Sequence, residues 1–260
     1  MKASPSGLFL SLATIAAILA TLGFNVLSNF FPPGGLNIGE ISNTLLAGVQ
    51  IIPASYAFSI WGLIYLGLIA YGVYQFLPSQ RQNSTLRWVN IFLIGACVAQ
   101  ILWVYLFTVQ QFWLSVLVML AILLPLIGAY LQLKTHPVRS RQRKWFADLP
   151  FSIYLAWISV ATIVNVASAL YSSGWRGWGI GETGWTAVML VIGVAIAGIL
   201  AIQQADIAFT LVFVWAYIAI AVRQADNSTI LITAILGAIA LAALLWIGIT
   251  RNRNRKTNPV

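Results

Sequence analysis

The sequence predicts an all-α, polytopic membrane protein, a helix bundle with about eight transmembrane helices. Hydrophobic residues make up 60% of the 260 residues and charged residues only 7%, whereas about 25% of a typical soluble domain is charged. So few charges cannot cover the outside of a folded chain in water, so lipid must surround most of it. The apolar residues also fall into stretches of about 20, the helix length that crosses a hydrocarbon core of about 30 Å.

Eight stretches of the chain fit this length. The predicted spans are roughly 8–31, 55–77, 87–108, 111–133, 149–171, 185–203, 206–223 and 228–249. The first begins like a signal peptide, with Lys2 before an apolar run, but it is too long and lacks a convincing cleavage site, so we expect a retained helix. The seventh is the shortest, because Asp206 and Arg223 bracket it.

The basic residues orient these spans. If the N-terminus is inside, the inner segments hold Lys2, Arg81, Arg87, Lys134, Arg139, Arg141, Arg143, Lys144, Arg251, Arg253, Arg255 and Lys256, and the outer segments hold Arg176 and Arg223. This asymmetry follows the positive-inside rule and predicts cytoplasmic N- and C-termini. The net charge of +9 is then a topology signal, and we expect no nucleic-acid partner. The tail 250–260 is predicted to be a basic cytoplasmic segment that anchors the last span, with binding of anionic lipid or a partner as the alternative.

Few residues are suited to catalysis or metal binding. Cys97 is the only cysteine and His136, in a basic loop, the only histidine. A His/Cys metal site and a Ser-His-Asp or Cys-His arrangement are therefore not expected, and we predict neither enzymatic activity nor a metal.

The five acidic residues lie at or outside the span ends. A proton-coupled carrier usually needs an ionisable group at membrane depth, so this class is disfavoured. Asp148, before Leu149 and Pro150, is interpreted as the N-cap of the fifth span.

Aromatic and neutral polar residues instead recur on single helix faces. They are Phe58, Trp61 and Tyr65 in the second span, Gln100, Trp103 and Phe107 in the third, and Tyr154, Trp157, Ala161 and Asn165 in the fifth. Steps of three and four residues place each set on one side of its helix. Two explanations remain open. Packing between helices, with amides as polar contacts, is favoured by periodicity alone, and the other is a cavity for a flat, largely apolar ligand.

These motifs resemble the TspO/MBR family, the tryptophan-rich sensory proteins whose animal members are the translocator proteins. The strongest match is the run from Tyr154 to Asn165, which is similar to the family's fifth-helix pattern Y-L-x-W-V-x-F-A-T-x-L-N. Pro53, Trp61 and Tyr65 match the family's P-x7-W-x3-Y in the second helix. Gln100, Trp103 and Phe107 occupy the places of its N-x-x-W-x-x-x-F in the third.

The sequence also departs from the family pattern. The family's W-x-P-P is Gln50-Ile-Ile-Pro53 here, Phe58 stands one place late, and Gln100 replaces Asn. The family's Leu-Pro before the helix-five Tyr is displaced to Leu149-Pro150. Because these positions surround the pocket mouth in the family, the identity of a ligand is not inherited with the resemblance.

The resemblance implies a five-helix bundle over residues 1–171 that binds tetrapyrroles, or sterols in animals, under a lid formed by the loop Phe31–Ala54. Residues 172–249 would add three transmembrane helices that have no counterpart in five-helix relatives. Their small residues, such as Gly193, Gly198 and Gly237, would cover the surface that relatives use to dimerise or build a second cavity, so homodimerisation stays open.

The leading functional hypothesis is an integral membrane protein of a prokaryotic or organellar membrane that binds a hydrophobic planar molecule for sensing, buffering or transport. A tetrapyrrole is the first candidate; no cofactor is required, although a bound porphyrin or haem is compatible. The predicted ligand-binding residues are Phe58, Trp61, Tyr65, Gln100, Trp103, Phe107, Tyr154, Trp157, Ala161 and Asn165. The alternatives are a small-molecule carrier without proton coupling and a scaffold whose aromatics only pack. Besides this ligand, membrane lipid is the expected partner.

Overall fold

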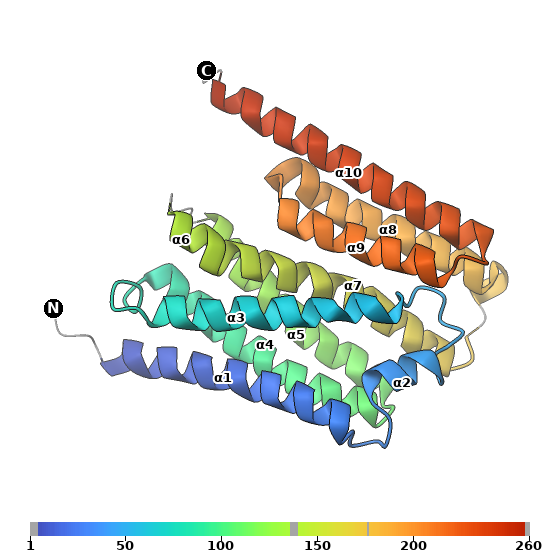
Figure 1. Ribbon diagram of the computed structural model, residues 1–260, viewed down its shortest axis with the longest axis horizontal. Helices are drawn as coiled ribbons and strands as arrows, with labels where there is room; N and C mark the ends of the chain where they lie inside the picture. The colour runs from blue at the N-terminus through green and yellow to red at the C-terminus, as the bar shows by residue number, and fades with distance from the viewer. Residues whose placement is uncertain (1–4, 136–139, 176, 258–260) are drawn as a thin grey trace. The chain divides into compact units, whose positions relative to one another are not determined.

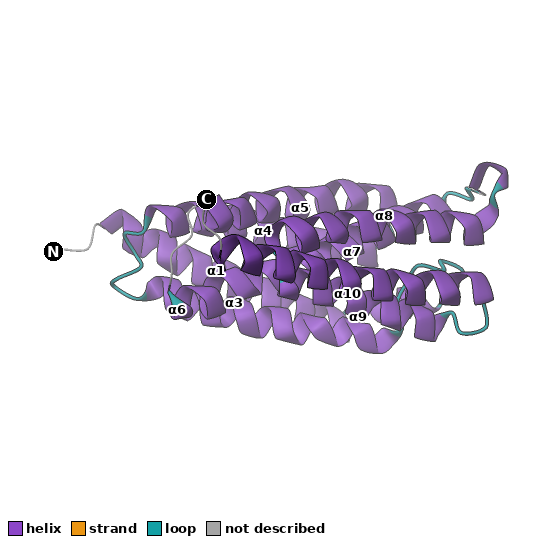
Figure 2. Ribbon diagram, turned by 90° about the horizontal axis from the view of Figure 1, so that it is seen from above, coloured by secondary structure: helices purple, strands orange, loops and turns teal. Residues whose placement is uncertain are grey.

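The computed structural model describes residues 5–135, 140–175 and 177–257, and within them it contains helices and no strand (Figures 1 and 2). Lys2, His136, Arg139 and Arg176, on which some predictions rest, lie outside the described residues. The elements are α1 (Pro5–Phe30), α2 (Ile38–Asn43), η1 (Ser55–Ser59), α3 (Ile60–Phe76), α4 (Ser84–Thr108), α5 (Phe112–Thr135), α6 (Arg141–Arg143), η2 (Lys144–Asp148), α7 (Leu149–Ser172), η3 (Gly177–Gly179), α8 (Gly181–Gln204), α9 (Ile207–Arg223) and α10 (Ser228–Thr257).

The predicted polytopic helix bundle is confirmed. Seven helical segments of the described chain are long and apolar enough to cross a membrane, and the shorter apolar helix α9 is the eighth candidate. At 1.5 Å per residue, the 17 residues of α9 extend about 26 Å, close to the thickness of the hydrocarbon core. The seventh predicted span is therefore the shortest, as its bracketing charges indicated.

The chain forms two compact units. The first comprises Met1–Asn43 and Ser59–Ile158, and the second comprises Thr44–Phe58 and Ser159–Val260. The boundary falls inside α7, whereas the sequence placed a division at residue 171. The segment Thr44–Phe58, which includes the second half of the predicted lid, belongs with the C-terminal helices.

In the first unit, α4 lies against both α5 and α1, and α1 also packs on α3 (Figure 1). Asn83 caps α4, because its side-chain oxygen accepts hydrogen bonds from the backbone N–H groups of Thr85 (3.0 Å) and Leu86 (3.2 Å). Gly34 touches the other end of α4. A Cβ atom at Gly34 would lie 1.9 Å from the carbonyl oxygen of Thr108, so only glycine fits there.

The start of the fifth span differs from the prediction. Ser140, not Asp148, is the N-cap, and its hydroxyl accepts from the backbone N–H of Arg143. The helix then continues through a π-helical stretch, in which the N–H of Leu149 bonds to the carbonyl of Lys144. A π turn widens the helix just before Pro150, which cannot donate a backbone hydrogen bond. The N-cap assignment of Asp148 is therefore wrong, because the helix begins two turns earlier.

In the second unit, α10 packs along both α8 and α9 (Figure 1), and small residues allow close approach. Tyr217 of α9 lies between Gly193 and Gly237, where an added Cβ atom would come within 2.5 Å of the Tyr217 side chain. The hydroxyl of Tyr217 donates a hydrogen bond to the carbonyl of Leu190. These glycines thus create the space for one buried tyrosine. Helix α10 also continues to Thr257, so the predicted basic tail begins as helix.

Candidate functional site

The first unit contains an aromatic cluster built by α3 and α7. Trp61 and Tyr65 are four residues apart on α3, and their rings stack with centroids 5.7 Å apart and planes at 27°. Tyr154 of α7 meets Trp61 edge to face at 6.2 Å. The sequence predicted that Trp61 and Tyr65 share one helix face, and the stack shows that they do. Trp61 is half-buried, while Tyr65 and Tyr154 are buried.

Gln100 of α4 joins the two tyrosines of this cluster. Its amide Nε2 donates a hydrogen bond of 2.9 Å to the hydroxyl oxygen of Tyr65, and its Oε1 accepts one from the hydroxyl of Tyr154. Gln100 is only 1% exposed. A buried amide needs partners for both of its ends, and the two tyrosines supply them. Gln100 therefore positions Tyr65 and Tyr154, and one hydroxyl donor remains on Tyr65, without an acceptor among the described residues.

Trp103 follows Gln100 by one turn on α4. Its ring lies beside Phe107 at 5.2 Å, and Phe107 in turn meets Phe112 edge to face at 5.3 Å. Trp103 is 7% exposed, yet its indole Nε1 is buried and has no hydrogen-bond partner in the part of the chain that the structure describes. Buried indole N–H groups usually have a partner, and an unsatisfied one costs about 1–3 kcal/mol. Trp103 is therefore a candidate donor to a bound molecule.

The other predicted site residues are divided between the two units. Trp157, also in the first unit, is buried on α7, 2% exposed. Phe58, Ala161 and Asn165 belong to the second unit, in which Asn165 is buried and Phe58 and Ala161 are half-buried. The structure thus assembles Trp61, Tyr65, Gln100 and Tyr154 directly. The contribution of Phe58, Ala161 and Asn165 to the same site stays a prediction.

A second polar layer of the first unit was not predicted. The hydroxyl of Tyr71 donates to Oδ1 of Asn90 at 2.5 Å, and Nδ2 of Asn90 donates to Oε1 of Gln75 at 3.0 Å. Gln75 extends this series of hydrogen bonds to α1, because its Nε2 donates to the carbonyl of Ser11 at 3.1 Å. The spacing of Tyr71 and Gln75, one turn apart on α3, was the available signal, but spacing does not identify a partner on another helix.

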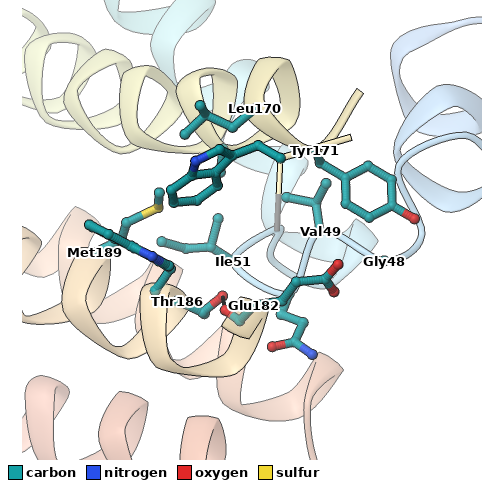
Figure 3. A pocket seen from close by; sticks show the side chains of 12 residues that line it. Gly48, Val49, Ile51, Leu170, Tyr171, Glu182, Thr186 and Met189 are labelled. Carbon is teal, nitrogen blue, oxygen red and sulfur yellow. Dashed lines mark hydrogen bonds between the residues drawn. The ribbon is translucent and has the colours of Figure 1, made fainter. Parts of the chain in front are cut away.

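The second unit has its own pocket, lined by the loop Gly48–Ile51, the end of α7 and the first turns of α8. Val49 and Ile51 of this loop line the pocket together with Leu170 of α7 and Met189 of α8, and the carboxylate of Glu182 lies at the side of the pocket (Figure 3). The cavity volume is about 40 Å³, which holds about three water molecules. This pocket is too small for a tetrapyrrole.

The loop at this pocket is bound to the C-terminal helices. Thr183 of α8 donates to the side-chain oxygen of Gln50 at 3.0 Å, and the backbone N–H of Ala54 donates to the carbonyl of Ala219 at 3.0 Å. The indole N–H of Trp215 donates to the carbonyl of Ala57 at 3.2 Å. The second half of the predicted lid is thus fixed to α8 and α9 within the second unit.

The family model described as TSPO-like protein matches residues 11–247 of the chain. The chain belongs to the TSPO-like family. The match runs past residue 171 and includes α8, α9 and most of α10, so the three C-terminal helices of this TSPO-like protein are part of the family's pattern. No curated protein and no solved structure matches the chain. Together with the apolar helices, the family establishes an integral membrane protein of the TspO type.

Proposed function

We propose that this TSPO-like protein binds a hydrophobic planar small molecule at the aromatic cluster of its first unit, with a tetrapyrrole as the first candidate. The observation that carries the proposal is the buried indole N–H of Trp103, which has no hydrogen-bond partner among the described residues. In a lipid-surrounded bundle, water is not at hand to satisfy this donor. A ligand with a carbonyl or carboxylate oxygen would satisfy it.

The chemistry of the neighbouring side chains favours a flat ligand. The ring of Trp61 lies 5.7 Å from that of Tyr65 and 6.2 Å from that of Tyr154, so the three offer both π faces and edges. Phe107 extends the aromatic surface beside Trp103. Aromatic rings gain both buried area and favourable stacking from a planar partner. The hydroxyl hydrogen of Tyr65, which has no acceptor among the described residues, adds a second polar contact. Tetrapyrroles combine a large π surface with oxygen acceptors at their periphery, which matches this set.

The cluster can bind such a molecule without a metal ligand from the protein. No group of three or more His, Cys, Asp or Glu side chains that could hold a metal ion occurs in the described part of the chain. A metal-free tetrapyrrole would be recognised by its ring system and its oxygen atoms. Binding of this kind suits sensing, buffering or movement of the ligand.

The test is a titration of the detergent-solubilised protein with protoporphyrin IX, followed by the Soret band and by tryptophan quenching. Trp103→Phe keeps an aromatic ring and removes the N–H donor together with part of the indole ring system. We expect saturable binding by the wild type and about tenfold weaker binding by Trp103→Phe, the loss for one hydrogen bond to a charged acceptor. The Soret band reports affinity whichever tryptophan is replaced.

Trp88→Phe is the matched control, because Trp88 lies on the same helix and is 53% exposed. Its affinity for protoporphyrin should equal that of the wild type. Absence of saturable binding by the wild type would exclude the proposal. Equal affinities for wild type and Trp103→Phe would remove Trp103 from the site and leave the cluster with a packing role.

A further inference from the structure

One end of the first unit contains a second, polar cavity that the proposed function does not use. It has a volume of about 300 Å³ and lies between the first turns of α1, the α3–α4 loop and the start of α4. Its lining includes Leu10, Arg81, Asn83, Arg87 and Asn90. The loop that supplies Arg81 connects the second and third spans, and the distribution of basic residues predicts it to be cytoplasmic.

The charge of this cavity is positive. Arg81 and Arg87 line it, and no acidic residue does. Nε of Arg81 donates to the carbonyl of Phe76 at 2.7 Å, and its guanidinium lies 4.3 Å from the centre of the Phe76 ring. These contacts hold the Arg81 side chain in place, while its two terminal NH2 groups make no hydrogen bond to another described residue. The N-terminal end of α4, capped by Asn83, adds the partial positive charge of the helix dipole.

A buried hydrogen-bond donor completes the lining. Asn90 is 4% exposed, and its orientation is fixed because Oδ1 accepts from Tyr71 while Nδ2 donates to Gln75. An amide nitrogen carries two N–H groups, and the second of Asn90 has no acceptor among the described residues. Two guanidinium groups, a helix N-terminus and this amide thus contribute donors and positive charge to a lining whose other polar side chains are neutral, which is the chemistry that recognises phosphate.

We propose that this cavity binds the phosphate group of an anionic phospholipid from the cytoplasmic leaflet. The lipid is the expected source because the cavity lies where two membrane spans end, at the depth of the headgroups. Basic pockets between transmembrane helices on the cytoplasmic side are known to bind acidic headgroups. The arginines would contact the phosphate, and Leu10 of α1 would lie beside the start of the acyl chains. The site is separate from the aromatic cluster.

The experiment measures phospholipids retained by the full-length protein in detergent, using native mass spectrometry. The probes are phosphatidylglycerol, phosphatidylcholine and inorganic phosphate. We expect one phosphatidylglycerol to be retained per chain, with about tenfold preference over phosphatidylcholine. Arg87→Gln should lower the affinity for phosphatidylglycerol about fivefold, and Arg87→Glu should lower it further, because one of the two cavity charges is removed and then reversed.

Arg141→Gln and Arg141→Glu are the matched controls. Arg141 is exposed, is predicted to lie on the same side of the membrane, and does not line the cavity. Retention should be unchanged in both. An equal loss in the Arg87 and Arg141 variants would overturn the proposal, since it would reflect the charge of the whole face. Binding of inorganic phosphate as tight as that of phosphatidylglycerol would also overturn it, by assigning the cavity to a free anion. Thermal unfolding without added lipid identifies any variant that is misfolded.

Discussion

The bridge formed by Gln100 makes a quantitative prediction for the first unit. Tyr154→Phe removes the hydroxyl that donates to Oε1 of Gln100 and leaves the aromatic ring in contact with Trp61. Gln100 is 1% exposed and Tyr154 fully buried, so no water replaces the lost donor. Interhelical hydrogen bonds in membrane proteins contribute about 0.6 kcal/mol on average and about 1.7 kcal/mol at most, whereas an orphaned buried acceptor costs about 1–3 kcal/mol. We expect Tyr154→Phe to cost about 1–2 kcal/mol.

A double-mutant cycle separates this bridge from general packing. Gln100→Leu removes both ends of the amide at once, and it leaves the hydroxyls of Tyr65 and Tyr154 without their partner. When Tyr154→Phe is already present, Gln100→Leu should cost about 1 kcal/mol less than it does alone, because the orphaned Oε1 disappears with the amide. Residues in one hydrogen-bond network typically show coupling of this size.

The assay is equilibrium unfolding in mixed detergent micelles, with helicity as the signal. Tyr105→Phe is the matched control, because Tyr105 lies on the same helix as Gln100 and is 47% exposed. Its effect should remain within about 0.5 kcal/mol. Additive effects of Tyr154→Phe and Gln100→Leu would refute the reasoning, since they would mean that the two side chains do not depend on each other.

Two further predictions concern packing and topology. Gly237→Ala should destabilise the protein by about 1–3 kcal/mol, because the new Cβ atom would lie 2.5 Å from the ring of Tyr217. The control Gly62→Ala should be neutral or stabilising, because a Cβ atom there would have no described atom within 4 Å. Equilibrium unfolding in mixed micelles measures the stability of both variants. Reporter domains fused at residues 140 and 178 should lie on opposite sides of the membrane, and reporters on the same side would contradict the arrangement of the predicted spans.

The sequence predicted those features that depend on one helix at a time. Apolar length identified the spans, and steps of three and four placed Trp61 with Tyr65 and Trp103 with Phe107, pairs whose rings the structure brings to 5.7 and 5.2 Å. Partners on different helices were harder to predict. Periodicity marked Gln100 as a polar contact, but it could not show that two tyrosines occupy both ends of its amide.

Helix ends were also predicted less well than helix centres. The basic run at the end of α10 carries no apolar signal, yet the helix continues through it to Thr257, because extending an existing helix is far easier than nucleating one. At the start of α7, Asp148 and Pro150 resemble a helix beginning, but the helix already present from Arg141 continues through a π turn. A local capping pattern cannot show that a helix has already begun in the preceding residues.

The first unit repeats one arrangement at two depths. In each layer a tyrosine of α3 meets an amide of α4: Tyr65 with Gln100, and Tyr71 with Asn90. The two amides are ten residues apart, about 15 Å along the helix. Neither layer uses a charged group, so neither bears the cost of placing a charge within the membrane.

The two layers differ in which hydrogen-bond donors remain without an acceptor among the described residues. This difference explains why a different ligand is proposed for each layer. The layer of Tyr65 and Gln100 leaves the N–H of Trp103 and the hydroxyl donor of Tyr65 beside aromatic rings. This arrangement favours a largely apolar molecule with few acceptors. The layer of Tyr71 and Asn90 leaves one N–H of Asn90 in a cavity with Arg81 and Arg87. This arrangement favours an anion. If the two sites are independent, Arg87→Gln will leave protoporphyrin binding unchanged, and Trp103→Phe will leave phosphatidylglycerol retention unchanged.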